Sequence, residues 1–173
     1  VAAEMQRLTC GAHGALVTAV SPRAFEQAFD MLRSRGTMAL VVEPEASSRA
    51  LYVRPIGSLT TRVLAGTADA AQPFWSPDGK FIAFVTSGKL KKIDAAGGPA
   101  QLICDVKGFT GGTWSPSGTI IFGSPEGLFR VSEEGGTPEP LTKIEDGESG
   151  HYWPRALPDG QSYLYLAWAS EPT

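Results

Sequence analysis

The sequence predicts a mainly β protein built from repeated, four-stranded antiparallel sheets. Trp114 follows Trp75 by 39 residues, and each tryptophan stands just before a Pro-x-Gly turn. Later in each unit a Gly-Gly pair, Gly97-Gly98 or Gly135-Gly136, recurs after 38 residues. Short alternating segments of strand length lie between these turns. A repeat of this length, with four short strands in each unit, is typical of β-propeller blades.

The first 48 residues lack this repeat and predict a separate β-α-β segment. Residues 14–20 are apolar nearly throughout, as in a buried strand. Ser21 and Pro22 begin a helix over 22–35, which Gly36 ends. Residues 37–42 form a second buried strand. The two strands should be parallel, with a right-handed crossover.

This segment resembles the cofactor domain of zinc-dependent alcohol dehydrogenases. The resemblance rests on residues 11–21, on Ala24 and Phe25, and on Gly36 and Thr37. It implies that the stretch at 18–20 would approach a nicotinamide dinucleotide. The sequence contains no G-x-G-x-x-G turn to hold the pyrophosphate, however. We therefore expect no bound nicotinamide cofactor, and a remnant dehydrogenase is the least favoured function.

Residues 49–173 predict three blades' worth of antiparallel strands. Residues 51–56 and 60–64 fit the third and fourth strands of a blade, and two complete blades follow. The first two strands of another blade lie near 152–157 and 161–168. Three blades are too few to close a ring. A homodimer that pairs each C-terminal half-blade with the partner's N-terminal half-blade would give a six-bladed ring.

The same region resembles TolB-type, WD-like propeller repeats, especially those attached to bacterial serine/threonine kinases. The residues that carry the resemblance are 51–55, 73–79, 88–94, Thr113-Trp114 and 151–154. No kinase motif is present. The resemblance therefore implies a sensor or scaffold role.

Several residues of the repeat have a structural interpretation. Pro77-Asp78-Gly79 is a hairpin turn, in which proline presets φ, aspartate bonds the backbone and glycine takes a positive φ. Core packing between blades is expected for Trp75, Trp114 and Trp153, with an aromatic ligand platform as the alternative. Because the turn after Trp153 comes three residues later, Trp153 should occupy a different pleat position from the other two. Lys89, Lys91 and Lys92 should form the solvated side of one strand.

The composition excludes several classes of partner. A net charge of −3 without a basic stripe argues against nucleic acid. The apolar runs are too short for membrane insertion. No signal peptide is visible, which leaves the bacterial cytoplasm as the default location. Cys10 and Cys104 are expected to be reduced thiols without metal-ligand company.

One set of polar residues is a candidate ligand site at the propeller channel. The segments that lead into the innermost strands contain Asp69, Gln72, Asp105, Asp146, Glu148 and His151. Carboxylates such as Asp69 and Glu148 are suited to calcium. A calcium ion would polarise an ester carbonyl while His151 moves protons, as in a lactonase or esterase.

The leading functional prediction is a binding module without catalytic machinery, acting on a protein or small ligand. No serine lies in a nucleophile-elbow pattern, and no histidines or cysteines have zinc spacing. The calcium-dependent hydrolase stays as the alternative, so whether the chain is an enzyme is left open. No cofactor other than calcium is indicated. The ligand is not identified by the sequence.

Overall fold

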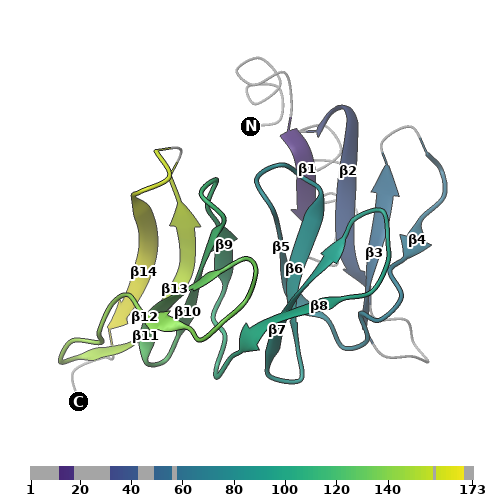
Figure 1. The fold of residues 1–173 in the computed structure, drawn as a ribbon. Coiled ribbons are helices and arrows are strands. Elements are labelled where there is room, and N and C mark those ends of the chain that lie inside the picture. The colour runs from purple at the N-terminus through teal and green to yellow at the C-terminus, as the bar shows by residue number, and fades with distance from the viewer. Residues whose placement is uncertain (1–11, 18–31, 43–48, 56–57, 158, 170–173) are drawn as a thin grey trace.

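The chain folds into a row of four β-sheets that follow one another in chain order. The computed structural model describes residues 12–17, 32–42, 49–55, 58–157 and 159–169, which contain fourteen strands. Figure 1 shows the sheets side by side, from β1–β4 at one end to β13–β14 at the other. This is a mainly β fold, and residues 70–145, all of them described, contain no helix, as predicted.

The two central sheets are complete four-stranded blades with the predicted meander order. The first consists of β5 (Ala71–Trp75), β6 (Phe81–Thr86), β7 (Lys89–Asp94) and β8 (Gln101–Asp105). The second consists of β9 (Gly112–Trp114), β10 (Thr119–Ser124), β11 (Gly127–Ser132) and β12 (Glu139–Pro140). All neighbours within them are antiparallel.

The turns form for the local reasons that the sequence indicates. Asp78 Oδ1 accepts bonds from Ser76 Oγ at 2.7 Å and from the Lys80 N–H at 3.0 Å, and Gly79 has φ +71°. The Gly-Gly pairs join the third and fourth strands, and both members of each pair have positive φ. A side chain at these positions would be strained.

The N-terminal sheet differs from the prediction in two ways. Its order is β1 (Ala12–Val17), β2 (Leu32–Val42), β3 (Ala50–Pro55) and β4 (Arg62–Val63). The parallel pairing of β1 with β2 is confirmed. The predicted helix over 22–35 is wrong at residues 32–35, because these belong to β2, where Leu32 pairs with Ala12. The rest of that helix lies outside the described residues.

The second difference concerns the N-terminal half-blade. The prediction left β3 and β4 open for a partner chain, but β2 of the same chain pairs antiparallel with β3 from Thr37 to Val42. An apolar strand needs a hydrogen-bonded neighbour, and β3 offers one. The alcohol-dehydrogenase-like segment and the repeat therefore share one sheet.

The predicted pair of C-terminal strands is present as a two-stranded antiparallel hairpin. It consists of β13 (Glu148–Ala156) and β14 (Tyr163–Ala169), paired antiparallel. No other strand pairs with β14 within the described part of the chain. Its side chains stay largely exposed, including Leu164, Leu166 and Trp168.

Apolar side chains fill the spaces within and between the blades. One cluster lies around Leu90, Trp114 and Phe122, and another around Leu51, Phe84 and Ile93. Lys92 was expected on a solvated face but is buried, because it lies over the Phe81 ring at 5.5 Å and pairs with Glu134 across the interface between blades.

Two further features of the described residues complete the fold. Cys104 is a free, buried thiol, as predicted, while Cys10 lies outside the described residues. None of the residues that the structure describes forms a helix long and apolar enough to cross a membrane.

Candidate functional site

A residue with left-handed backbone recurs at the same place in, or directly before, three successive innermost strands. It stands three residues before the last residue of β5, β9 and β13, and is Gln72, Gly111 and Trp153 in turn. The φ angles are 46°, 121° and 48°. Glycine accepts such angles readily, whereas glutamine and tryptophan are strained by them. Strained backbone of this kind tends to gather at binding sites.

The strands β5 and β13 accommodate this residue through a β-bulge. The register shifts between Ala71 and Phe74 in one strand, and between Tyr152 and Arg155 in the other. A proline, Pro73 or Pro154, follows the left-handed residue in both cases. Both strands lie at a sheet edge, where a missing proline N–H breaks no ladder bond. Bulges change the direction in which neighbouring side chains point.

These bulges border a hollow of about 680 Å³ between the innermost strands of three blades. Trp153 is 61% exposed beside it, so the core position expected for this residue is wrong. The predicted difference between Trp153 and the other two tryptophans is confirmed. The lining residues are Gln72, Pro73, Phe74, Phe109, Thr110, Gly111, Gly112, Tyr152, Trp153, Pro154 and Arg155.

The segment before β9 ties the walls of the hollow together. Thr110 Oγ1 donates to the His151 carbonyl oxygen at 2.7 Å, and the Trp153 N–H donates to the Thr110 carbonyl oxygen at 3.2 Å. Gln72 Nε2 donates to the Phe109 carbonyl oxygen at 3.2 Å. These bonds connect three blades, so the hollow is held in shape before any ligand arrives.

Gly111 is required at this point for two reasons. Its φ of 121° suits glycine, and a Cβ atom there would lie 2.9 Å from Trp153 Cδ1. The Trp153 indole therefore packs directly over the Gly111 backbone. This contact orients one face of the indole, while the side chain as a whole stays accessible.

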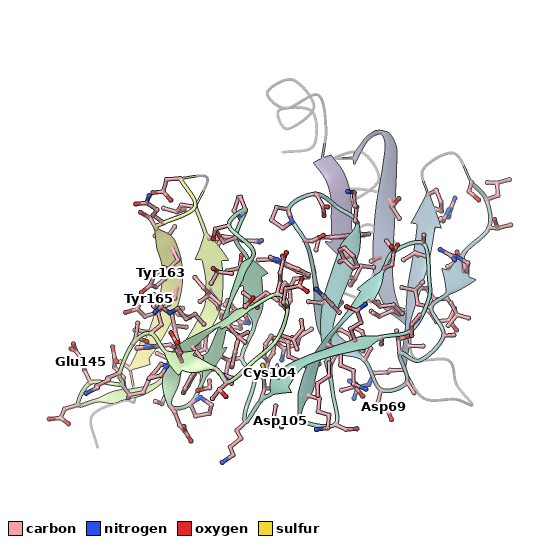
Figure 2. The ribbon with its side chains drawn as sticks, viewed as in Figure 1. Asp69, Cys104, Asp105, Glu145, Tyr163 and Tyr165 are labelled. Carbon is pink, nitrogen blue, oxygen red and sulfur yellow. The ribbon has the colours of Figure 1, made fainter. Side chains whose placement is uncertain are left out.

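Most of the predicted channel acids lie elsewhere. Of the six predicted site residues, only Gln72 lines the hollow. Figure 2 shows Asp69 and Asp105 well apart from each other and from Glu145, next to Asp146 in the chain. Asp105 pairs with Lys89 Nζ at 2.5 Å. The described residues contain no group of three or more His, Cys, Asp or Glu that could hold a metal ion.

Glu148 and His151 do come together, but in a closed network. His151 is 1% exposed, and its Nδ1 and Nε2 lie 2.6 Å from Thr142 Oγ1 and 3.1 Å from Glu148 Oε2. Thr142 Oγ1 also accepts from the Leu128 N–H at 2.9 Å. The Glu145 N–H, and then His151, lower the pKa of Glu148. The network ties the loop before β13 to that strand.

The other buried candidate for nucleophilic chemistry is Cys104. Burial, with a smaller effect of the Asp105 charge, raises the pKa of its thiol to about 11. The thiolate is the reactive form of cysteine, and it is scarce at neutral pH when the pKa is this high. Cys104 therefore serves as a core side chain.

Sequence reasoning overlooked Tyr152, Arg155 and the aromatic walls of the hollow. One signal was available: Gln72-Pro73 and Trp153-Pro154 precede the hairpin turns by similar distances. Aligning the repeats on these turns rather than on tryptophan would have matched the two dipeptides. That alignment would also have separated Trp153 from the core tryptophans.

Curated relatives match parts of the chain. It is 42% identical over 96 residues to an alcohol dehydrogenase of Rhizobium meliloti, covering 53% of this chain and 28% of the enzyme. It is 30% identical over 105 residues to the uncharacterized protein Atu1656 of Agrobacterium fabrum, covering 54% and 34%. The chain thus spans about a third or less of these relatives. No family model matches it.

Solved structures identify the fold. A putative TolB from Agrobacterium tumefaciens superposes with a TM-score of 0.63 at 21% identity, over 78% of this chain and 51% of that one. TolB from Acinetobacter baumannii gives 0.61 at 18% identity, over 83% and 39%. The fold is that of the TolB β-propellers. The alcohol dehydrogenase match, being partial, is compatible with a fragment of such an enzyme joined to TolB-like blades.

Proposed function

We propose that this chain is a binding module that captures its ligand in the hollow between the innermost strands. The observation that carries this proposal is the exposed, strained Trp153 beside that hollow. Exposed tryptophan offers a large contact area at small entropic cost, and it is enriched among residues that dominate binding. The likeness to TolB propellers supports a binding or interaction role.

The chemistry of the described residues favours binding over catalysis. His151 is enclosed and both its ring nitrogens have partners, while Cys104 is buried with a raised pKa. Neither residue lines the hollow. The hollow offers aromatic faces, the Gln72 amide, the hydroxyls of Thr110 and Tyr152, and one guanidinium, and the Thr110 hydroxyl is already bonded to the His151 carbonyl oxygen.

Selection from a random peptide library on the immobilised chain tests the proposal. Selected peptides should lose most of their affinity for Trp153→Ala and keep it for Trp168→Ala. The two tryptophans are exposed to similar extents, but only Trp153 lines the hollow. Peptides that bind both variants as well as the original chain would contradict a site in the hollow.

A calcium-dependent hydrolase, a kinase-attached origin of the repeats and a remnant dehydrogenase are the alternatives to this proposal. A calcium-dependent lactonase or esterase would need Asp69, Glu148 and their neighbours to converge, and no specific observation favours it. Thermal melts with calcium and with chelator address this alternative, since a bound ion would raise the Tm. No observation supports a kinase-attached origin of the repeats. A remnant dehydrogenase has one observation in its favour, the partial alcohol dehydrogenase match, which covers 53% of this chain and 28% of that enzyme.

A further inference from the structure

The hollow contains one cation and no anion. Among its lining residues Arg155 is the only charged side chain, and the others are aromatic, small or uncharged. Arg155 lies just after the bulge of β13, two residues beyond Trp153. Within the described part of the chain its guanidinium makes no ion pair or hydrogen bond, unlike Arg62 and Arg130, whose partners are defined.

Arg155 is exposed at the hollow, so a ligand from solvent can reach its guanidinium. An arginine presents a planar set of donors that matches the two oxygens of a carboxylate. Phe74, Phe109 and Trp153 line the same hollow and offer aromatic faces beside this guanidinium. A single cation in the hollow suits a singly charged group better than a phosphate dianion.

We propose that the hollow binds a carboxylate that is carried next to an aromatic group. This inference rests on the proposed function. The carboxylate pairs with Arg155, the aromatic group packs on Trp153, and Gln72 accepts an N–H of the ligand through its amide oxygen. That oxygen has no partner among the described residues, because the Gln72 bond to Phe109 uses Nε2.

Two pairs of short peptides separate the sources of the carboxylate. Ac-Trp-Gly with a free C-terminus is compared with its amide, and Ac-Trp-Glu-NH2 with Ac-Trp-Gln-NH2. Each acid differs from its neutral counterpart by one charge. Binding is followed by isothermal titration to the whole chain, and the original chain is compared with Arg155→Met, Arg155→Lys and the control Arg130→Met.

We expect at least one acid to bind about tenfold or more tightly than its neutral counterpart, as charged hydrogen bonds predict. The first pair reports a terminal carboxylate and the second an acidic side chain. The preference should vanish in Arg155→Met, persist in part in Arg155→Lys, and stay intact in Arg130→Met. Arg130 lies outside the hollow and pairs with Glu139 at 2.9 Å.

Other outcomes overturn the inference in distinguishable ways. If acids and neutral peptides bind equally, and Trp153→Ala weakens both, the hollow is a binding site but carboxylate recognition is wrong. If Arg155→Met still binds the acid more tightly than its neutral counterpart, a group other than Arg155 recognises the carboxylate. If no peptide binds at millimolar concentration, the inference fails, and the library selection alone decides the proposed function.

Discussion

Trp75 and Trp114 occupy the same position in successive blades, yet only one indole has a hydrogen-bond acceptor. Trp114 Nε1 donates to Glu133 Oε2 at 2.6 Å. Trp75 Nε1 is buried without a partner among the described residues. In the first blade the position equivalent to Glu133 is Ala95. The Ala95 N–H donates to the carbonyl oxygen of Lys80, which follows the turn glycine, and the Glu133 N–H donates to the carbonyl oxygen of the turn glycine Gly118. The unpaired N–H therefore follows from one substitution between repeats.

Ala95→Glu should stabilise the chain by about 1 kcal/mol, the usual net value of one hydrogen bond. The new carboxylate would accept from Trp75 Nε1, as Glu133 does from Trp114. Urea unfolding measures the change. The control repeats the substitution in Trp75→Phe, which has no N–H, so any gain there reflects other contacts, such as one with Arg62. Equal gains in both backgrounds would contradict the explanation.

Trp153 differs from these two tryptophans, because its backbone adopts a strained conformation. Its φ of 48° is unfavourable for a bulky residue. Trp153→Gly should therefore leave the free energy of unfolding unchanged or raise it by up to about 1 kcal/mol. Trp168→Gly, in regular strand, should lower it by about 1 kcal/mol. Denaturant titration of both variants checks this, and a clear loss in Trp153→Gly would argue against strain.

At the scale of elements, Gly123 controls the approach of β10 to β13. A Cβ atom at this position would lie 2.3 Å from the His151 carbonyl oxygen and 2.3 Å from Thr110 Oγ1. Real contacts are much longer, so one blade would have to move. The sheet of β9–β12 and the hairpin β13–β14 are thus held together at a point where only glycine fits.

Gly123→Ala should destabilise the chain by about 2 kcal/mol or more, as overpacking does. Gly66→Ala is the comparison, because Gly66 has φ +79° and no atom within 4 Å. That variant should lose only the backbone cost, about 1 kcal/mol. Thermal unfolding ranks the two, and a smaller loss for Gly123→Ala would mean that the blades separate easily.

The hairpin turns give part of the stability a dependence on pH. The Ser76 hydroxyl, followed by the Lys80 N–H, lowers the pKa of Asp78 from its ordinary 3.8. The folded state thus holds this proton less tightly than the unfolded state. The stabilisation is complete above about pH 4 and is lost as the pH falls through the lowered pKa.

Asp78→Ser tests this dependence, because serine stands at the equivalent position, Ser117, in the next blade. The original chain should be the more stable at pH 6, and the difference in urea midpoint should shrink towards pH 3. Ser117→Ala is the control, with a difference that does not change with pH. If the difference in urea midpoint between Asp78→Ser and the original chain does not change with pH, the Asp78 carboxylate is not the source of the pH dependence.

At the scale of the whole molecule, the free edge and outer face of β14 favour assembly. Leu164, Leu166 and Trp168 alternate along the strand and so share one face of the hairpin, where they are 62%, 42% and 53% exposed. Exposed apolar edge strands are templates for association. We still expect a homodimer. A blade made of β13–β14 and the partner's β3–β4 would first require β2 to leave β3.

Light scattering at micromolar concentration should give the mass of two chains. Leu166→Lys should give one chain, because a charge on that face opposes its burial. Leu59→Lys, at a position 92% exposed in a loop, should leave the mass unchanged. A mass of one chain for the original protein would show that the assembly prediction is wrong.

The strands and turns of residues 70–169 could largely be predicted from the sequence, because they depend on residues close together in the chain. Pro77-Asp78-Gly79 makes its turn through its own φ angles and hydrogen bonds, and the Gly-Gly pairs do the same. Alternating strands between such turns pair with their nearest neighbours in the chain. The sequence alone therefore determined the meander, its repeat and the C-terminal hairpin.

Tertiary contacts decided the rest, including the candidate site. Lys92 is buried because Glu134 of the next blade meets it, and β2 completes a blade because β3 offers an edge. Trp153 is exposed because a bulge shifts its register and Gly111 lets it pack against backbone. Each outcome depends on residues far away in the chain. The residue pattern of one strand does not indicate which distant residues will contact it. The hollow could therefore be found only from the packing of the three blades.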